Sequence, residues 1–453
     1  MSNPPRTTII TGCQIATVDS AGTEHRDGYV VIQGNLIAAV GSGSPDPGAY
    51  PGAQRIDGSG CLLTPGLVNT HHHLYQWITR GYATDDTLFG WLTTLYPIWA
   101  QINADLLHAS ASANLGWLAL TGCTTSTDHH YVFPSGVGDL MEAEITAAQQ
   151  IGLRFHPTRG SMNLGESAGG LPPDSVVEQH EQILIASEAA IDRWHDPSFG
   201  SMLRIALAPC SPFSVTGDLM RDSAELARSK GVRLHTHLAE TPDEEAFCLE
   251  KFGATPTQYA ESLGWLGDDV WLAHSVHLSD EAIARYAATG TGAAHCPTSN
   301  GRLGSGIAPI RKLLDAGAPV GLGVDGAASN ESGRMFDEMH LALLAARFRG
   351  GPLALTARES LRMATAGGAR LLGGQDEYGS IDVGKLADLA LWRVDDLCGA
   401  GIEDPVTALV LGMPTLRSSW VNGEPVVDDG HLMNADEIAL AEASGRAAAA
   451  IRP

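Results

Sequence analysis

The sequence has 453 residues, of which 44% are hydrophobic and 52 are glycine. Length and composition fit one large globular domain with a smaller one, and they exclude disordered and fibrous chains. Lys and Arg number 28 against 52 Asp and Glu, which gives a net charge of −24. Such a charge disfavours nucleic acid and anionic membranes as partners and favours a small neutral or cationic molecule.

Cysteine use and hydropathy point to a cytoplasmic protein. The seven cysteines are scattered and form no Cys-x-x-Cys pair, so neither a disulfide framework nor a thiolate zinc site is indicated. The N-terminus carries no apolar run of the kind found in signal peptides. No apolar stretch approaches the ~18 residues that a transmembrane helix needs, so we expect no membrane association.

Both ends of the chain are predicted to form short strands. Alternating segments interrupted by Gly and Asp lie at 7–14, 29–33, 36–40 and 54–57, and similar segments return at 379–381, 387–393, 408–411 and 420–427. We expect residues 1–63 and 374–430 to meet in one small β-sandwich. Helix formers from 435 to about 450 predict a helical tail within residues 431–453.

The middle of the chain, residues 64–373, repeats one unit: a short apolar strand with a polar end, then an amphipathic helix. The strand ends fall at 67–73, 123–130, 153–161, 203–211, 232–240, 270–277, 292–300 and 319–330. Helical stretches include 139–151, 177–194, 217–230, 243–263 and 307–316. Eight such units predict an α/β chain with a (β/α)8 barrel, in which catalysis takes place at the carboxyl ends of the strands.

Two histidines at the first strand end suggest half of a metal site. His71 and His73 are two residues apart, so on a strand their side chains point the same way while His72 points the other way. Neutral imidazole is a common zinc ligand, although a His-x-His pair alone is more often a packing detail.

Other strand ends supply partners for this pair. His237 ends the fifth strand, and Glu240 follows three residues later; His274 ends the sixth strand and Asp325 follows the eighth. A carboxylate beside an imidazole cluster suits metal-assisted hydrolysis, because the ion lowers the pKa of water and the carboxylate carries its proton. We assign His235 to the core or to the support of the ligands, and we assign mainly structural roles to His129, His130, His277 and His295.

Together these motifs resemble the amidohydrolase superfamily, in its branch of mononuclear deaminases. The resemblance spans nearly the whole chain and includes the closing segment from Gly379 to Asp388. A closer similarity, to 8-oxoguanine deaminases, is carried by Thr70–Gln76, Leu95–Trp99, Asp128–Tyr131, Gly160–Glu166 and Ala208–Phe213.

The resemblance implies one metal ion per chain. By this resemblance, His71, His73, His237 and Asp325 hold a single zinc ion, with iron(II) as the alternative. Two-metal relatives bridge their ions with a carboxylated lysine on strand 4, and none of the four lysines lies there.

The resemblance also implies catalytic roles. Asp325 and His274 activate water, and Glu240 moves its proton to the ring nitrogen beside the attacked carbon before ammonia leaves. Gln76 and Arg159 are candidates to bind the heterocycle, with structural hydrogen bonding as an equal alternative. A homo-oligomer is expected.

The resemblance favours 8-oxoguanine as the substrate, with urate and ammonia as products. Gly301 and the segment 331–334 depart from the 8-oxoguanine deaminase pattern on loops near the expected substrate. Isoxanthopterin deamination and s-triazine hydrolysis are therefore alternatives, although some triazine chlorohydrolases lack the strand 8 aspartate that is retained here as Asp325. A non-catalytic binding barrel is disfavoured by the presence of Glu240, His274 and Asp325.

Overall fold

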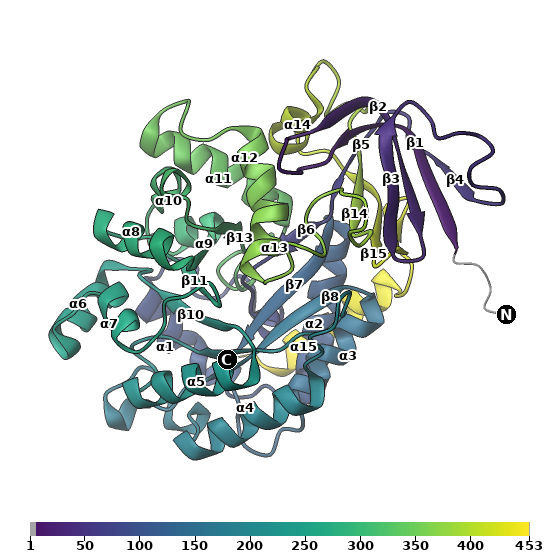
Figure 1. Ribbon diagram of the computed structural model, residues 1–453. Helices are drawn as coiled ribbons and strands as arrows, with labels where there is room; N and C mark the ends of the chain where they lie inside the picture. The colour runs from purple at the N-terminus through teal and green to yellow at the C-terminus, as the bar shows by residue number, and fades with distance from the viewer. Residues whose placement is uncertain (1–5, 453) are drawn as a thin grey trace.

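The computed structural model describes residues 6–452 and contains a closed barrel of eight parallel strands (Figure 1). Each strand end predicted from the sequence corresponds to one of them, so the predicted barrel is confirmed. The strands are β6 (Leu67–Asn69), β7 (Cys123–His130), β8 (Arg154–Ser161), β9 (Ala206–Pro209), β10 (Leu234–Leu238), β11 (Val270–His274), β12 (Gly292–His295) and β13 (Val320–Leu322).

The barrel strands are short and buried along their whole length. Several are rich in small residues, such as Ala-Leu-Ala-Pro in β9 and Gly-Ala-Ala-His in β12. A closed eight-stranded barrel has an interior just wide enough for side chains, and small residues leave room for larger neighbours. Here the larger neighbours include the histidines of β7, β10 and β11.

Helices follow the strands and surround the barrel (Figure 1). Polar N-cap side chains, such as those of Asn103, Asp139, Thr216 and Ser279, accept backbone N–H bonds where helices begin. The larger helices are α1 (Leu88–Trp99), α2 (Ala104–Leu120), α3 (Leu140–Ile151), α4 (His180–Trp194), α5 (Gly217–Lys230), α8 (Asp280–Thr289), α10 (Ile310–Ala316) and α11 (Met335–Gly350). Shorter ones include the 3₁₀ helix η1 (Leu74–Thr79), α9 (Pro297–Arg302), α12 (Ala357–Arg362), α13 (Gly368–Leu371) and α14 (Pro405–Thr407).

One predicted helix is two helices in the structure. The stretch predicted at 243–263 divides into α6 (Pro242–Phe252) and α7 (Pro256–Ser262). Gly253 has a φ of 66°, which ends α6 in the left-handed conformation that glycine tolerates best. Thr255 then starts α7 with a capping box, and Pro256 occupies its first turn.

The two ends of the chain meet, as the sequence predicts, and they share one mixed sheet of nine strands. Two of the predicted strands are wrong: residues 408–411 lie in the π-helix η5 (Ala408–Gly412), and residues 379–381 form no strand. Its strands run in the order β17-β16-β15-β14-β5-β1-β2-β3, with β4 paired to β1. The N-terminal strands are β1 (Thr7–Ala16), β2 (Glu24–Gln33), β3 (Leu36–Ser42), β4 (Gln54–Asp57) and β5 (Cys61–Pro65), and the C-terminal ones are β14 (Leu389–Arg393), β15 (Leu416–Val421), β16 (Glu424–Asp428) and β17 (His431–Leu432). In Figure 1 the purple N-terminal strands lie beside the yellow-green C-terminal ones.

A buried ion pair fastens this sheet to the barrel. Arg154 of β8 donates to the carboxylate of Asp388, with an Nε–Oδ2 distance of 2.9 Å. The predicted tail helix is α15 (Glu437–Ala450), which contacts α2 on the outside of the barrel. In residues 6–452 we find no helix with the length and hydrophobicity needed to cross a bilayer.

Candidate active site

The side chains predicted to form the site lie together at the carboxyl ends of the barrel strands. His71 and His73 follow β6, His237 lies in β10, His274 ends β11 and Asp325 follows β13. Because all eight strands are parallel, their carboxyl ends open at the same mouth of the barrel. All five residues are buried.

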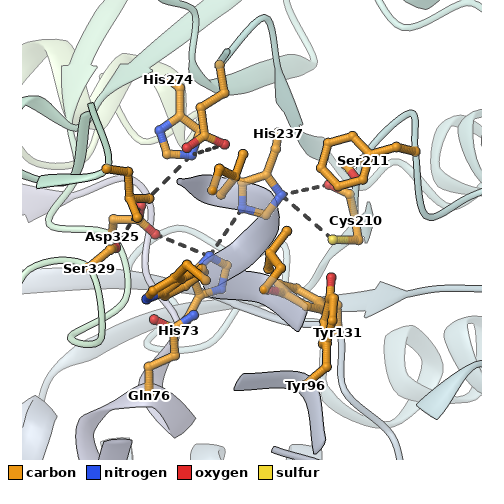
Figure 2. A pocket seen from close by; sticks show the side chains of 16 residues that line it. His73, Gln76, Tyr96, Tyr131, Cys210, Ser211, His237, His274, Asp325 and Ser329 are labelled. Atoms are coloured by element: carbon orange, nitrogen blue, oxygen red, sulfur yellow. Dashed lines mark hydrogen bonds and ion pairs between the residues drawn. The ribbon is translucent and has the colours of Figure 1, made fainter. Parts of the chain in front are cut away.

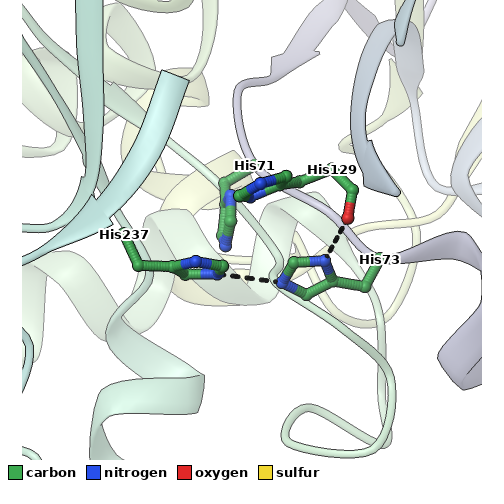
Figure 3. A group of neighbouring side chains, drawn as sticks. All are labelled: His71, His73, His129 and His237. Carbon is green, nitrogen blue, oxygen red and sulfur yellow. Dashed lines mark hydrogen bonds between the residues drawn. The ribbon is translucent and has the colours of Figure 1, made fainter. Parts of the chain in front are cut away.

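Three imidazoles face one another at the centre of this mouth (Figure 3). The ring centroid of His71 lies 4.8 Å from that of His73 and 4.9 Å from that of His237. The Nε2 atoms of His73 and His237 are 3.2 Å apart. Asp325 Oδ1 lies 3.3 Å from His71 Nε2 and 3.2 Å from His73 Nε2, so a carboxylate completes the group.

The outer nitrogen of each imidazole has a hydrogen-bond partner. The Nδ1 atoms of His73 and His237 each lie 2.7 Å from a backbone carbonyl, that of His129 and that of Cys210 respectively. A carbonyl can only accept, so Nδ1 carries the hydrogen and Nε2 is left as a lone-pair donor. This arrangement is common around metal-bound histidines, whose ring orientation is set by the second nitrogen.

His71 reaches the same tautomer through His235. The Nδ1 atom of His235 donates to the carbonyl of Trp271 at 2.8 Å, so its Nε2 can accept from His71 Nδ1, also at 2.8 Å. His235 therefore supports a ligand from one step deeper in β10, as its position in the sequence suggests. Its ring stacks on Trp271, with centroids 4.5 Å apart.

The group fits a metal ion by its chemistry. His71 Nε2 is buried and has no hydrogen-bond partner within residues 6–452, which is costly unless a cation or proton occupies the centre. Burial lowers the pKa values of His71 and His237 well below the ordinary range, so both rings are neutral and able to coordinate. Three imidazole nitrogens and one carboxylate oxygen form a typical zinc-binding set.

A second group extends from Asp325 toward the cavity. His274 Nε2 lies 3.5 Å from Glu240 Oε2 and 3.9 Å from Asp325 Oδ2. His274 Nδ1 lies 3.0 Å from Asn300 Oδ1, an acceptor that keeps the hydrogen on Nδ1 and leaves Nε2 free to take a proton. Asp325 therefore joins the imidazole group to an acid–base pair.

Burial sets the charge states of the two carboxyls in opposite directions. Burial and the nearby Asp325 carboxylate raise the pKa of Glu240 well above its usual range, which favours the protonated acid. Burial alone would also raise the pKa of Asp325, but the neighbouring rings of His71, His73 and His274 hold it well below its usual range. Two carboxyls with opposed proton affinities are suited to different catalytic tasks.

The backbone bends sharply where these residues emerge. Ala239, His274, Ser275 and Asp325 have φ values of 55°, 70°, 50° and 62°, in the left-handed region that non-glycine residues rarely adopt. Such conformations persist where surrounding contacts hold them, and they cluster at functional sites. At Ala239 the holding group is Glu244, whose carboxylate accepts the N–H groups of Ala239 and Glu240, both at 2.8 Å.

A cavity opens over the imidazoles (Figure 2). Its polar lining includes His73, His237, Glu240, His274 and Asp325, and its apolar lining comes largely from α1. Gln76 of η1 also lines it, and both atoms of its buried amide lack hydrogen-bond partners among the described residues. An unpaired amide in a cavity is well suited to bind the edge of a heterocycle.

Arg159 lies elsewhere. It is not among the residues that line this cavity. Its Nη2 lies 2.6 Å from Glu178 Oε1, and its guanidinium carbon lies 3.6 Å from the ring centroid of Phe133. The ion pair with Glu178 and the contact with Phe133 occupy the Arg159 guanidinium. The structure therefore brings Gln76 to the cavity but not Arg159.

The sequence analysis assigned a mainly structural role to His129, which the structure places beside the metal-ligand candidates. This residue of β7 belongs to the same buried imidazole group, and its ring stacks on His237 with centroids 4.7 Å apart. Its Nε2 donates to the carbonyl of Ala208 at 2.9 Å, and its Nδ1 has no partner in the described chain. Strand alternation was the available signal, since it turns His129 inward and His130 outward to Glu144 of α3.

Comparisons with known proteins agree with this geometry. The model of the amidohydrolase family matches residues 62–426. The 8-oxoguanine deaminase of Pseudomonas aeruginosa is 46% identical over 96% of this chain and 97% of its own length. An isoxanthopterin deaminase from an unknown prokaryotic organism is 37% identical over 93% of this chain and 90% of its own.

A solved structure supports both the fold and the family. The atrazine chlorohydrolase of Arthrobacter aurescens TC1, determined in complex with zinc, superposes with a TM-score of 0.92 at 35% identity. The match covers 97% of this chain and 100% of that one. A family match over most of the chain and a full-length relative of this identity show that the chain belongs to the amidohydrolase family, in which it is similar to 8-oxoguanine deaminase.

Proposed function

We propose that the protein is a metal-dependent deaminase that hydrolyses an amino-substituted nitrogen heterocycle, with 8-oxoguanine as its preferred substrate. In the balanced reaction, water replaces the amino group at a ring carbon and ammonia leaves, so 8-oxoguanine gives urate. The observation that carries the proposal is the position of Asp325. Its Oδ1 faces the imidazole group and its Oδ2 faces His274, so metal ligation and proton transfer share one carboxylate.

The metal would be held by His71, His73, His237 and Asp325. A bound zinc or iron(II) ion supplies Lewis-acid chemistry, which makes hydroxide available near neutral pH. We propose one ion per chain, because β9 carries no lysine that could bridge a second ion.

The residues around the cavity then move protons. Asp325 and His274 take the proton of the attacking water, because His274 Nε2 is free to accept and lies beside Asp325 Oδ2. Glu240, held protonated by burial, gives its proton to the ring nitrogen next to the attacked carbon. The proton held by Asp325 and His274 then passes to the amino nitrogen, the C–N bond breaks with loss of ammonia, and the proton of the new hydroxyl group returns to Glu240.

The substrate assignment rests on similarity and on charge. The 46% identity to an 8-oxoguanine deaminase extends over nearly both chains. The net charge of −24 disfavours nucleotides, whose phosphates would be repelled, so the free base is the expected form.

Ammonia release tests the reaction. The zinc-loaded protein should release ammonia from 8-oxoguanine, with isoxanthopterin, guanine and an aminotriazine measured beside it. We expect the highest kcat/KM for 8-oxoguanine, and a higher value for the triazine would contradict the proposal. Metal analysis should find one tightly bound ion per chain, against two for a bridged site.

A further inference from the structure

The wall that α1 contributes to the cavity contains a single hydroxyl group. Leu88, Trp91, Leu92 and Tyr96 all line the cavity from this helix. Trp91, Leu92 and Tyr96 follow Leu88 by three, four and eight residues, which places all four side chains on one face of the helix. The first three offer only apolar surface and the Trp91 ring, whose Nε1 donates to the carbonyl of Ala328 at 3.2 Å.

The Tyr96 hydroxyl is buried and unpaired. It has no hydrogen-bond partner in the part of the chain that the structure describes, and the residue is 0% exposed. Its ring is held edge-to-face against Trp99, with centroids 5.7 Å apart. A buried hydroxyl without a partner costs free energy, so a group that lines a cavity in this state indicates a ligand. Burial, with the Cys210 thiol nearby, raises the pKa of Tyr96 well above its ordinary value, so the hydroxyl keeps its proton.

Tyr96 and Gln76 mark two separate polar edges of the cavity. In Figure 2, Tyr96, Tyr131, Cys210 and Ser211 lie on one side of the His73–His237 pair. Gln76, Asp325 and Ser329 lie on the other side. A planar bicycle that reacts beside Asp325 therefore extends its second ring toward Tyr96, along the apolar wall of α1.

We propose that Tyr96 determines specificity by donating a hydrogen bond to a carbonyl oxygen on the second ring of the substrate. This inference rests on the proposed deaminase function and deepens it. For 8-oxoguanine the acceptor is the carbonyl of the five-membered ring. Guanine has no carbonyl on that ring and leaves the hydroxyl unpaired, which is the basis for its rejection.

Tyr75 provides a matched control for this proposal. Its hydroxyl is also buried and without a partner among residues 6–452, and its ring also packs edge-to-face on Trp99, at 5.2 Å. Tyr75 does not line the cavity, and its ring packs on His73 and Tyr131 as well as on Trp99. Tyr96→Phe and Tyr75→Phe therefore remove the same hydroxyl oxygen from equally buried rings, of which only the Tyr96 ring lines the cavity.

The test compares the two variants on two purines. Tyr96→Phe should lower kcat/KM for 8-oxoguanine about tenfold and change the value for guanine less than about threefold, on the scale where roughly 1.4 kcal/mol is tenfold. Tyr75→Phe should leave the ratio of the two purines unchanged. Equal losses on both purines, or no loss in Tyr96→Phe, would overturn the assignment.

A binding measurement separates this inference from the proposed function. Titration calorimetry of the metal-loaded protein with the products should show that Tyr96→Phe weakens urate about tenfold while xanthine binding stays within about threefold. If the wild type bound urate in this Tyr96-dependent way without turnover, the deaminase proposal would fail and the Tyr96 contact would stand. If it turned over 8-oxoguanine and Tyr96→Phe bound urate normally, the inference would fail alone.

Discussion

At the scale of single residues, the site depends on which atom of each side chain is left free. Carbonyl acceptors take the Nδ1 hydrogens of His73 and His237, and Asn300 takes that of His274. Each ring therefore presents a bare Nε2, to the metal position or to the acid–base pair. Sequence alone could place these histidines at strand ends, but the acceptors come from other parts of the barrel and were not predictable from it.

Glu240 is expected to act on protons and not on the metal. Glu240→Gln should keep one metal ion per chain and lower kcat by about 10²–10⁴-fold, the usual contribution of a positioned general acid or base. Metal analysis and steady-state kinetics on the same preparation check both parts. Asp325→Asn should be at least as damaging and should also weaken metal binding, because it removes an anionic ligand. Activity of Glu240→Gln within a few-fold of wild type would remove this residue from the mechanism.

The position of the Gln76 amide at the cavity edge is expected to depend on the neighbouring Gly326. A Cβ built on Gly326 would lie 1.8 Å from Gln76 Oε1, so Gly326→Ala must displace the amide from the cavity edge. The amide ends a flexible side chain, which predicts a folded protein with a KM for 8-oxoguanine raised about tenfold.

Gly301→Ala is the matched control for this glycine, because nothing lies within 4 Å of a Cβ there. Its KM should stay within about twofold of wild type. An unchanged KM in Gly326→Ala would mean that Gln76 does not bind the substrate.

At the scale of elements, the sequence predicted the strands well and their continuations less well. Predicted strand ends such as 292–300 run past β12 (Gly292–His295) into α9 (Pro297–Arg302). The eighth prediction, 319–330, covers β13 and the turn that carries Asp325. The turns escape prediction because Ala239, His274 and Asp325 adopt left-handed conformations that their side chains disfavour intrinsically. Tertiary contacts, not local propensity, fix them.

The turn between β10 and α6 illustrates such a contact and gives a prediction. Glu244 accepts two consecutive N–H groups, those of Ala239 and Glu240. A glutamine has one acceptor oxygen, so Glu244→Gln turns an N–H donor toward a second donor and displaces the turn. We expect kcat to fall about tenfold or more with KM and metal content nearly unchanged, since a misplacement of about 1 Å can cost 10²-fold.

Glu250→Gln on the same helix is the control, because Glu250 is exposed. Its kcat should equal that of wild type. A Glu244→Gln enzyme with a normal kcat would show that the turn holds itself without the carboxylate.

At the scale of the whole molecule, the repeated strand–helix unit made the barrel predictable. Eight repeats leave few alternatives for a chain of this length, and the pairing of the two ends followed from their shared strand pattern. The orientation of Arg159 was not predictable in the same way. Its place on β8 fits the cavity mouth, but Glu178 and Phe133 hold its guanidinium away from the cavity.

Stability should depend on pH through the buried histidines. Burial lowers the pKa of His295 to about 3, whereas an unfolded histidine titrates near 6.5. Between these values the unfolded chain binds a proton that the folded chain excludes, so wild type loses stability as the pH falls through about 6.5. One such proton corresponds to about 1.4 kcal/mol per pH unit. His295→Asn removes this titrating group. The difference in unfolding free energy between wild type and variant should therefore narrow by about 1.4 kcal/mol for each pH unit as the pH falls from 6 to 4. Urea titrations at several pH values measure this difference. A constant difference for His295→Asn would mean that this ring is protonated in the folded protein.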